Sequence, residues 1–323
     1  MNIRIFISCF EEQRLNRIAT SHFFSKFLKF GSIEKIQGNL EVEICKLLKV
    51  KRQLDWPLAA ISRLGECGTV DEYYWFKINP VNLVLQRDCF SLGNLISLSP
   101  DEARSIVETL NHHFNEDGLY FDTSSGNQFF YLFTKNRPDI LTSPPQGLLG
   151  KNTTPHLPSG SESVKWHGFM NEMQMLLHNH QINETRERLG QPIVNSLWLY
   201  GGGGMPELGK LENQFLYGDS FFSRGISRLS PGEVLPVPSS FSELMRLNKD
   251  EAVFLYEDDV PDLDTQLFSE IWVAMKRFKI KKIDLTIFNG VDLLNLSIRS
   301  TDLFKFWKKK QSLDSLTGLT LHG

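Results

Sequence analysis

The stretch of this sequence best suited to chemistry is NSLWLYGGGGMPELGK, residues 195–210. An apolar run leads directly into four glycines, a proline and, further on, a lysine. Glycines that follow a strand allow the backbone to approach a ligand closely and can turn N–H groups toward an anion. The same glycines can also form a plain turn with positive φ. The sequence leaves both interpretations open, an anion-binding nest and a turn.

Two nucleotide-binding motifs are incomplete at this place. A dinucleotide fingerprint needs a glycine at position 206, where Pro206 stands. Gly204, Gly209 and Lys210 fit the GxxxxGK pattern of a phosphate loop, but Leu211 replaces the Ser or Thr that would hold magnesium. Pro206 also lacks one of the N–H donors that such a loop uses. We therefore do not expect nucleotide hydrolysis.

Two groups of residues could supply metal ligands. His167, His178 and His180 lie near Glu172, but a spacing of two points the last two rings to opposite sides of a helix, and no HExxH motif is present. The acidic run at 257–264, EDDVPDLD, follows a predicted strand and precedes a predicted helix, whose start favours acidic residues in any case. We expect capping, core or surface roles for the histidines and a solvated helix start for the acids.

Charge and hydropathy limit the partners. The net charge is −3 with acids and bases interspersed, so we expect no nucleic-acid partner. No run approaches the roughly 18 apolar residues of a membrane span, and the N-terminus lacks the features of a secretory signal. We expect a cytoplasmic protein without a membrane partner. The segment DLFKFWKKK, 302–310, could contact a partner or an anionic surface, or be a solvated helix end.

The clearest predicted helix covers 99–117. Ser99 is the expected N-cap, Pro100 occupies the first helical position, and Glu102 completes a capping box. Gly118 is expected to end the helix.

Strands are predicted on both sides of this helix. The segments 119–124 and 128–135 indicate a hairpin. Upstream, 72–93 contains two strand-like runs that we expect to be broken at Asn79 and Pro80.

The second half of the chain alternates helices and strands. An amphipathic helix is predicted in 161–180 and another in 262–278, with strands at 194–200, 252–259 and 281–289. This order is typical of α/β proteins.

These elements predict an α/β fold with a mixed α+β N-terminal half, built on a mixed sheet flanked by helices. We expect an α+β region at 1–137 that carries the hairpin, and an α/β region at 164–323 that carries NSLWLYGGGG. The segment 138–163 between them is rich in Pro, Gly and Ser, and we interpret it as a connection between domains.

Several segments together resemble the RpfE-type regulatory proteins of proteobacteria, a family catalogued among the cofactor-independent phosphoglycerate mutases. They are NPVNLVLQRD (79–88), LSPDEARSIVETLNHHFNEDGLYF (98–121), the block from NEMQMLLH to GGGGMP (171–206), and DLFKFWKKK. The resemblance implies a cytoplasmic regulatory protein and a degenerate form of the alkaline-phosphatase-like, phosphoglycerate-mutase-like arrangement.

The middle of this block also resembles the substrate-covering insertion of archaeal-type phosphoglycerate mutases. The likeness lies in Arg186 with Gly190, in VNSLWLYGGGG, which contains the pattern N-x-x-x-x-x-G-x-G, and in SRGIS at 223–227. In that family the region contacts phosphorylated substrate, and Arg224 stands where the family commonly has lysine. The resemblance implies ligand-binding roles for Arg186, Asn195, Gly201, Gly203 and Arg224.

The catalytic machinery of those mutases does not carry over to this sequence. The family needs two metal ions held by Asp and His clusters and a Ser nucleophile. The start, MNIRIFISCF, lacks the family's Asp-Gly opening, and no histidine occurs between Gln181 and Leu321. We assign no catalytic residue and expect no cofactor, with Mn²⁺ or Mg²⁺ only if the chain is an active enzyme.

Three functions stay open. The chain could be a regulatory protein that lacks the dimetal site and binds a phosphorylated metabolite. It could be an active metal-dependent phosphoglycerate mutase or phosphatase. It could also be a protein-interaction module without a small ligand.

Overall fold

The chain folds into two compact units, described here from a computed structural model. Unit 1 combines Met1–Ile44 with Lys210–Gly323, and unit 2 is the continuous segment Cys45–Gly209. Unit 2 is therefore inserted into the sequence of unit 1. The structure describes residues 1–8, 22–125, 129–207, 214–218, 220–229, 251–256, 268–289 and 292–305.

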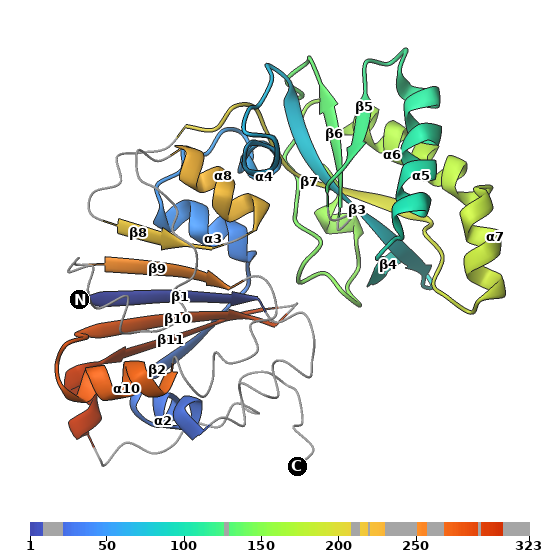
Figure 1. The fold of residues 1–323 in the computed structure, drawn as a ribbon. Helices are drawn as coiled ribbons and strands as arrows, with labels where there is room; N and C mark the ends of the chain where they lie inside the picture. Colours follow the sequence, from blue (N-terminus) through green and yellow to red (C-terminus); the bar gives the residue numbers. More distant parts are fainter. Residues whose placement is uncertain are drawn as a thin grey trace. The chain divides into compact units, whose positions relative to one another are not determined.

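Unit 1 is built on a six-stranded mixed sheet (Figure 1). The strand order is β2-β11-β10-β1-β9-β8; β1 pairs in parallel with β9 and β10, and β11 pairs antiparallel with β10 and β2. Its strands are β1 (Asn2–Ser8), β2 (Ser32–Ile36), β8 (Gln214–Tyr217), β9 (Glu251–Tyr256), β10 (Lys282–Phe288) and β11 (Leu293–Arg299). Its helices are α2 (His22–Phe30), the start of α3 (Leu40–Leu47), α8 (Phe221–Leu229), α10 (Phe268–Lys276) and the 3₁₀ turn η3 (Ser300–Phe304).

Side chains from one face of β1 lie in the core of unit 1. Ile3, Ile5 and Ile7 are buried, and because side chains alternate along a strand they lie on one face of the sheet. Helices α2 and α10 pack in the same core, where the rings of Phe27 and Trp272 meet edge to face with centroids 5.6 Å apart.

Unit 2 is built on five strands that pair only antiparallel. The long strand β3 (Tyr74–Leu85) pairs with β4 (Phe90–Leu95), β6 (Phe130–Thr134) and β7 (Ser196–Gly203), and β6 pairs with β5 (Tyr120–Thr123). The helices are α4 (Leu58–Cys67), α5 (Pro100–Phe114), α6 (Ser163–His178), α7 (Gln181–Arg188) and the 3₁₀ turn η1 (Thr154–His156). Helices α5 and α6 contribute to the larger core of this unit, and α4 contributes two alanines to a smaller one.

The mixed α/β fold agrees with the sequence, and two local predictions are confirmed. Helix α5 begins with the predicted capping box between Ser99 and Glu102, and Pro100 is its first residue. Strands β5 and β6 form the predicted hairpin. No helix among the described residues has the length and apolarity needed to cross a bilayer.

The predicted break at Asn79 and Pro80 is wrong, because β3 continues through both residues. Pro80 pairs with Leu197 of β7, and its carbonyl accepts a hydrogen bond from Ile96 N at 2.9 Å. The missing N–H of proline is tolerated at a ladder position where no donor is required.

The division into units also differs from the boundary expected at 138–163. That segment lies inside unit 2 and is held by the isolated bridges Leu141↔Ser159, Leu92↔Leu149 and Ser91↔Asn152. Its prolines and glycines reflect irregular backbone within one unit, a pattern that composition alone does not distinguish from a linker.

The glycines at the end of β7 make room for neighbouring elements. A Cβ atom on Gly203 would lie 2.4 Å from Cβ of Pro57, and one on Gly202 would lie 2.4 Å from the ring of Phe76. Gly201 has φ +68°, and its Cβ would lie 2.9 Å from Cβ of Leu58. The turn at the start of α4 can therefore lie directly on β7.

Replacing Gly203 by Ala should destabilise unit 2 by about 1–3 kcal/mol, because the added methyl group meets Pro57 backbone and ring atoms that cannot turn away. Gly168→Ala is the matched control: this position lies inside α6 with nothing within 4 Å of the added Cβ, so we expect stabilisation of about 0.5–1 kcal/mol. Urea denaturation followed by circular dichroism measures both. Equal effects of the two substitutions would contradict the packing role.

Candidate functional site

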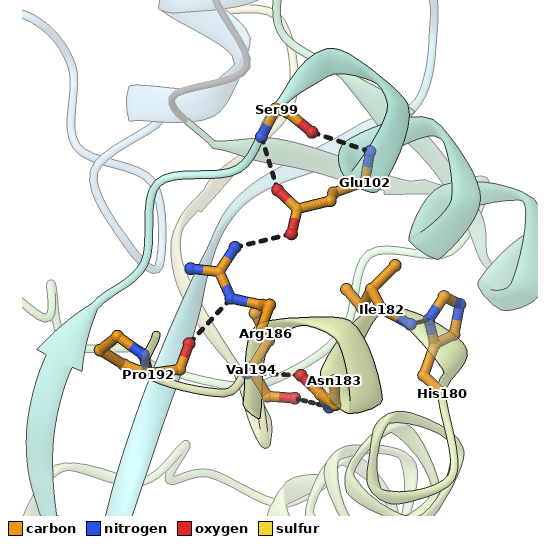
Figure 2. Close-up of polar contacts among 8 residues, drawn as sticks. All are labelled: Ser99, Glu102, His180, Ile182, Asn183, Arg186, Pro192 and Val194. Carbon is orange, nitrogen blue, oxygen red and sulfur yellow. Dashed lines mark hydrogen bonds and ion pairs between the residues drawn. The ribbon is translucent and has the colours of Figure 1, made fainter. Parts of the chain in front are cut away.

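Arg186 is buried within unit 2 and is held by two protein acceptors (Figure 2). Its Nη1 donates to Glu102 Oε1 at 2.8 Å, and its Nε donates to the carbonyl of Pro192 at 2.8 Å. The side chain is 8% exposed. In this geometry Arg186 ties α7 to the start of α5, which is a structural role.

The same carboxylate caps α5. Glu102 Oε2 accepts from Ser99 N at 2.8 Å, and Ser99 Oγ accepts from Glu102 N at 3.3 Å. Burial by itself would raise the pKa of Glu102, but the hydrogen bonds from Ser99 and the Arg186 guanidinium together hold this pKa below its ordinary value. Glu102 therefore stays ionised against Arg186.

Helix α7, which carries Arg186, is fixed at its start by polar side chains. His180 is the N-cap, and its Nδ1 accepts from Ile182 N at 3.4 Å. Asn183 bonds Leu177 O and both backbone groups of Val194 at 2.8–2.9 Å, so it bridges the end of α6 and the approach to β7. These contacts confirm a capping role for His180, as the sequence suggested for the histidines.

Asn195 extends the pairing of β7 with β3. Its Oδ1 accepts from Leu83 N at 2.7 Å and its Nδ2 donates to Leu83 O at 2.8 Å, so the amide takes the place of a backbone ladder pair. Asn195 precedes β7, whereas Gly201 and Gly203 lie at its other end. At about 3.3 Å per residue, roughly 25 Å separates Asn195 from Gly203.

Two backbone donors of the glycine run have side-chain partners inside unit 2. Gly201 N donates to Thr142 Oγ1 at 3.0 Å, and Gly204 N donates to Gln53 Oε1 at 3.0 Å. Gly203 stands opposite Trp75 in the ladder with β3. Gly201–Gly203 continue strand β7, so these three residues form neither the plain turn nor a turn-borne nest. The positive φ of Gly201 and the close packing of Gly202 and Gly203 account for these glycines.

Arg224 belongs to unit 1, whereas the other four predicted ligand residues belong to unit 2. It is exposed on α8, and its guanidinium lies over the ring of Phe221 at 5.0 Å. Gly209, Lys210 and Leu211, the acidic run at 257–264 and most of DLFKFWKKK lie outside the described residues.

A pocket of about 640 Å³ opens beside the last glycine of the run, within unit 2. Its lining includes Lys51, Arg52, Gln53, Tyr74, Arg137 and Gly204. The loop before α4 supplies the first three, β3 supplies Tyr74, and the segment after β6 supplies Arg137. The close packing of the glycines brings this loop against β7. Gly204 of the predicted motif therefore lines the pocket, whereas Gly201 and Gly203 pack against Leu58 and Pro57 inside unit 2.

Tyr74 gives the pocket a buried donor. The residue is 4% exposed, and its hydroxyl has no hydrogen-bond partner among the residues that the structure describes. Burial and, secondarily, the nearby Asp55 carboxyl raise the pKa of Tyr74, while the positive charge of Arg137 acts in the opposite direction. The phenol stays protonated at neutral pH and can donate to a ligand.

Asp55 is buried in the loop before α4, directly after the lining residues of that loop, and anchors the loop by hydrogen bonds. Oδ2 accepts from the Thr142 N–H at 3.1 Å and from the Thr142 hydroxyl, and Oδ1 accepts from Trp56 N at 2.8 Å. Burial raises the pKa of Asp55, although these hydrogen bonds and the charge of Arg52 act to lower it. Thr142 also binds Gly201 N, so one chain of hydrogen bonds joins the glycine run to the loop before α4.

Charges around the pocket favour an anion. Lys51 is paired with Glu207 at 2.9 Å, and Asp139, the other acidic residue of the lining, accepts a hydrogen bond from Ser161. Arg52 and Arg137 form no ion pair within the described ranges. Two unpaired guanidinium groups and a buried phenol are suited to phosphate or carboxylate oxygens.

No group of three His, Cys, Asp or Glu side chains that could hold a metal ion occurs in the part of the chain that the structure describes. His167 binds Pro158 O at 2.8 Å, and Glu172 pairs with His113 at 3.1 Å. His167 and Glu172 therefore each have a protein partner within unit 2.

Sequence comparison relates this chain to known enzymes. No protein-family profile matches it. It is 27% identical over 161 residues to a Geobacter sulfurreducens protein named "Probable 2,3-bisphosphoglycerate-independent phosphoglycerate mutase", and 29% identical over 153 residues to 2,3-bisphosphoglycerate-independent phosphoglycerate mutase 2 of Methanothermobacter thermautotrophicus. This chain is homologous to cofactor-independent phosphoglycerate mutases. The matches cover 49% and 47% of this chain but only 40% and 37% of the two mutases.

Two solved structures resemble the whole chain loosely. A cofactor-independent phosphoglycerate mutase from Thermoplasma acidophilum matches 98% of this chain and 94% of its own at 13% identity, with a TM-score of 0.43. A Pyrococcus horikoshii protein matches 92% and 87% at 13% identity, with a TM-score of 0.44. TM-scores below 0.5 do not establish a common fold, so the relation to the mutases stands on sequence.

Sequence reasoning missed the residues that line the pocket. Tyr74 lies in an aromatic strand, and nothing in its neighbours marks its hydroxyl as unpaired. Arg52 stands beside Lys51 and Arg137 lies two residues after Lys135, and the two arginines are separated by 85 positions. The sequence carries only a weak signal for these residues. Arg137 precedes the proline-rich segment and Arg52 precedes α4, the two places where irregular backbone faces the glycine run.

Glu102→Gln should lower the stability of unit 2 by about 1–2 kcal/mol at neutral pH, because it weakens both the cap of α5 and the pair with Arg186. The lowered pKa means that ionised Glu102 stabilises the fold above its ordinary value of 4.5 and that this contribution is lost as pH falls through the folded-state pKa. The difference between wild type and variant should therefore shrink below pH 4.5.

Urea unfolding across this pH range measures the effect. Asp101→Asn, one residue earlier and 92% exposed, is the control and should change stability little. A pH-independent loss in Glu102→Gln would contradict the electrostatic role.

Proposed function

We propose that this chain is a regulatory protein that binds a small phosphorylated carboxylic acid in the pocket of unit 2. The observation that carries the proposal is Tyr74, which lines the pocket and whose buried hydroxyl has no acceptor among the described residues, together with Arg52 and Arg137, which line the same pocket and form no ion pair within the described ranges. Such a donor costs free energy when it is left without a partner. A ligand oxygen would remove that cost.

The size and chemistry of the pocket support a small anionic ligand. Its volume of about 640 Å³ falls within the usual range for small-molecule sites. The arginines can each offer two parallel donors to a phosphate or carboxylate group. The relatives are named for reactions of phosphoglycerate, which carries both groups, and this makes phosphoglycerate the natural probe.

The regulatory part of the proposal depends on the resemblance to the RpfE-type family. The ligand contacts that we propose differ from those implied by the archaeal-type resemblance. Tyr74, Arg52 and Arg137 replace Arg186, whose guanidinium is committed to Glu102 and Pro192.

We expect 3-phosphoglycerate or 2-phosphoglycerate to bind more tightly than inorganic phosphate or glycerate, because only the phosphoglycerates present both anionic groups. Saturation at about 100 times the dissociation constant should stabilise the fold by about 2.7 kcal/mol. Tyr74→Phe should weaken binding about tenfold and Arg137→Ala about 10- to 100-fold. Isothermal titration calorimetry and thermal shift measure these effects.

Two matched substitutions serve as controls. Tyr73→Phe removes a hydroxyl from the neighbouring residue of the same chain segment, and Arg104→Ala removes an exposed arginine of α5; neither residue lines the pocket. If the four variants bind alike, or if no phosphoglycerate binds, the pocket is not the ligand site. Mutase turnover with Mn²⁺ or Mg²⁺ would instead establish the enzyme alternative and overturn the purely regulatory one.

A further inference from the structure

Unit 1 presents a cluster of exposed cations at the end of α10. The segment 276–282, KRFKIKK, contains five basic residues in seven. Lys282 is paired with Asp284 at 2.7 Å, whereas Arg277, Lys279 and Lys281 form no ion pair within the described ranges. This surface therefore carries uncompensated positive charge, although the whole chain is slightly acidic.

Exposed apolar side chains lie among these cations. The rings of Phe278 and Phe304 stack at 10° with centroids 5.8 Å apart, and they are 55% and 54% exposed. Val273, on the preceding turn of α10, is 45% exposed. Stacked rings of this exposure form an apolar group that stays exposed among the described residues. The basic–aromatic patch consists of Val273, Lys276, Arg277, Phe278, Lys279, Lys281 and Phe304.

The backbone places Phe278 at a position that usually belongs to glycine. Phe278 N donates to Met275 O at 2.9 Å and Lys279 N donates to Ala274 O at 3.0 Å, the two hydrogen bonds of a Schellman motif that ends α10. Phe278 has φ +55°, the left-handed conformation that disfavours a bulky side chain. The ring is not needed to end the helix, because glycine would do so with less strain.

We propose that the basic–aromatic patch docks on the surface of an anionic lipid bilayer. Basic side chains are attracted to anionic headgroups, and exposed Phe and Val side chains can enter the boundary between headgroups and acyl chains. The sequence expectation of no membrane partner was drawn from the lack of a spanning segment, which a peripheral contact does not need.

The kind of cation favours lipid over a polynucleotide or an acidic peptide. The segment 276–282 contains four lysines and one arginine. Lysine is a hydrated point charge suited to a diffuse anionic surface, whereas defined phosphate and carboxylate partners favour the planar fork of arginine. The exposed Val273 side chain on the same helix also suits acyl chains better than the stacked bases of a nucleic acid.

Sedimentation of the full chain with phosphatidylcholine vesicles, with and without phosphatidylserine, tests the proposal. We expect binding to the phosphatidylserine vesicles only, and weaker binding at about 0.5 M than at about 0.1 M salt. Arg277→Glu with Lys279→Glu should weaken binding at least about tenfold. Lys135→Glu with Lys151→Glu, the same charge change at two exposed positions of unit 2, should leave much more of the binding intact.

Phe278→Gly distinguishes an effect on vesicle binding from an effect on folding. The left-handed position suits glycine, so this variant should unfold at the wild-type temperature or above, yet bind phosphatidylserine vesicles about five- to tenfold more weakly. Unchanged vesicle binding in Phe278→Gly and in the double charge reversal would overturn the proposal. So would failure to bind vesicles combined with binding to polyglutamate or to single-stranded oligonucleotide, which would assign the patch to an acidic polymer.

Discussion

The arrangement of unit 2 depends on three consecutive positions of β7 that cannot carry a side chain. Gly201, Gly202 and Gly203 face Leu58, Phe76 and Pro57 at distances where a Cβ atom would overlap. The start of α4 therefore lies closer to the sheet than ordinary side chains permit. Close packing of this kind tolerates little change in volume, so the glycines fix where the preceding loop passes.

The loop before α4 brings two cations, Lys51 and Arg52, to the pocket. The hydrogen bonds that link Gly201, Thr142 and Asp55 hold the middle of this loop. Gln53, near the start of the loop, binds Gly204. Burying the Asp55 carboxyl is costly, as its raised pKa shows, and the cost is offset by donors from Thr142 and Trp56. A fixed wall of this sort lets Arg52 project from an ordered backbone. The glycine motif thus acts through geometry, while side chains elsewhere supply the donors.

Local signals in the sequence predicted local structure well. The capping box of α5 needs only Ser99 and Glu102 three residues apart, and the hairpin of β5 and β6 needs two β-rich runs around a turn. The sequence could not show that β7 pairs with β3 more than a hundred residues earlier, or that β1 pairs with β9 and β10 across the whole insertion. Those pairings depend on long-range contacts, for which a single sequence carries no local pattern.

The arginines illustrate the same limit for the site. Arg186 stands in the most specific motif of the sequence, yet its partner Glu102 is 84 positions away. The ion pair with Glu102 makes Arg186 a buried link between helices α7 and α5. Arg137 follows a strand in an unremarkable segment, but it is exposed and without an ion pair within the described residues. A guanidinium whose donors are already used by a carboxylate and a carbonyl offers less to a ligand than one that has kept them. Whether an arginine binds a ligand or holds two parts of the protein together therefore depends on which acceptors the fold brings to it. A sequence motif records only that an arginine is present.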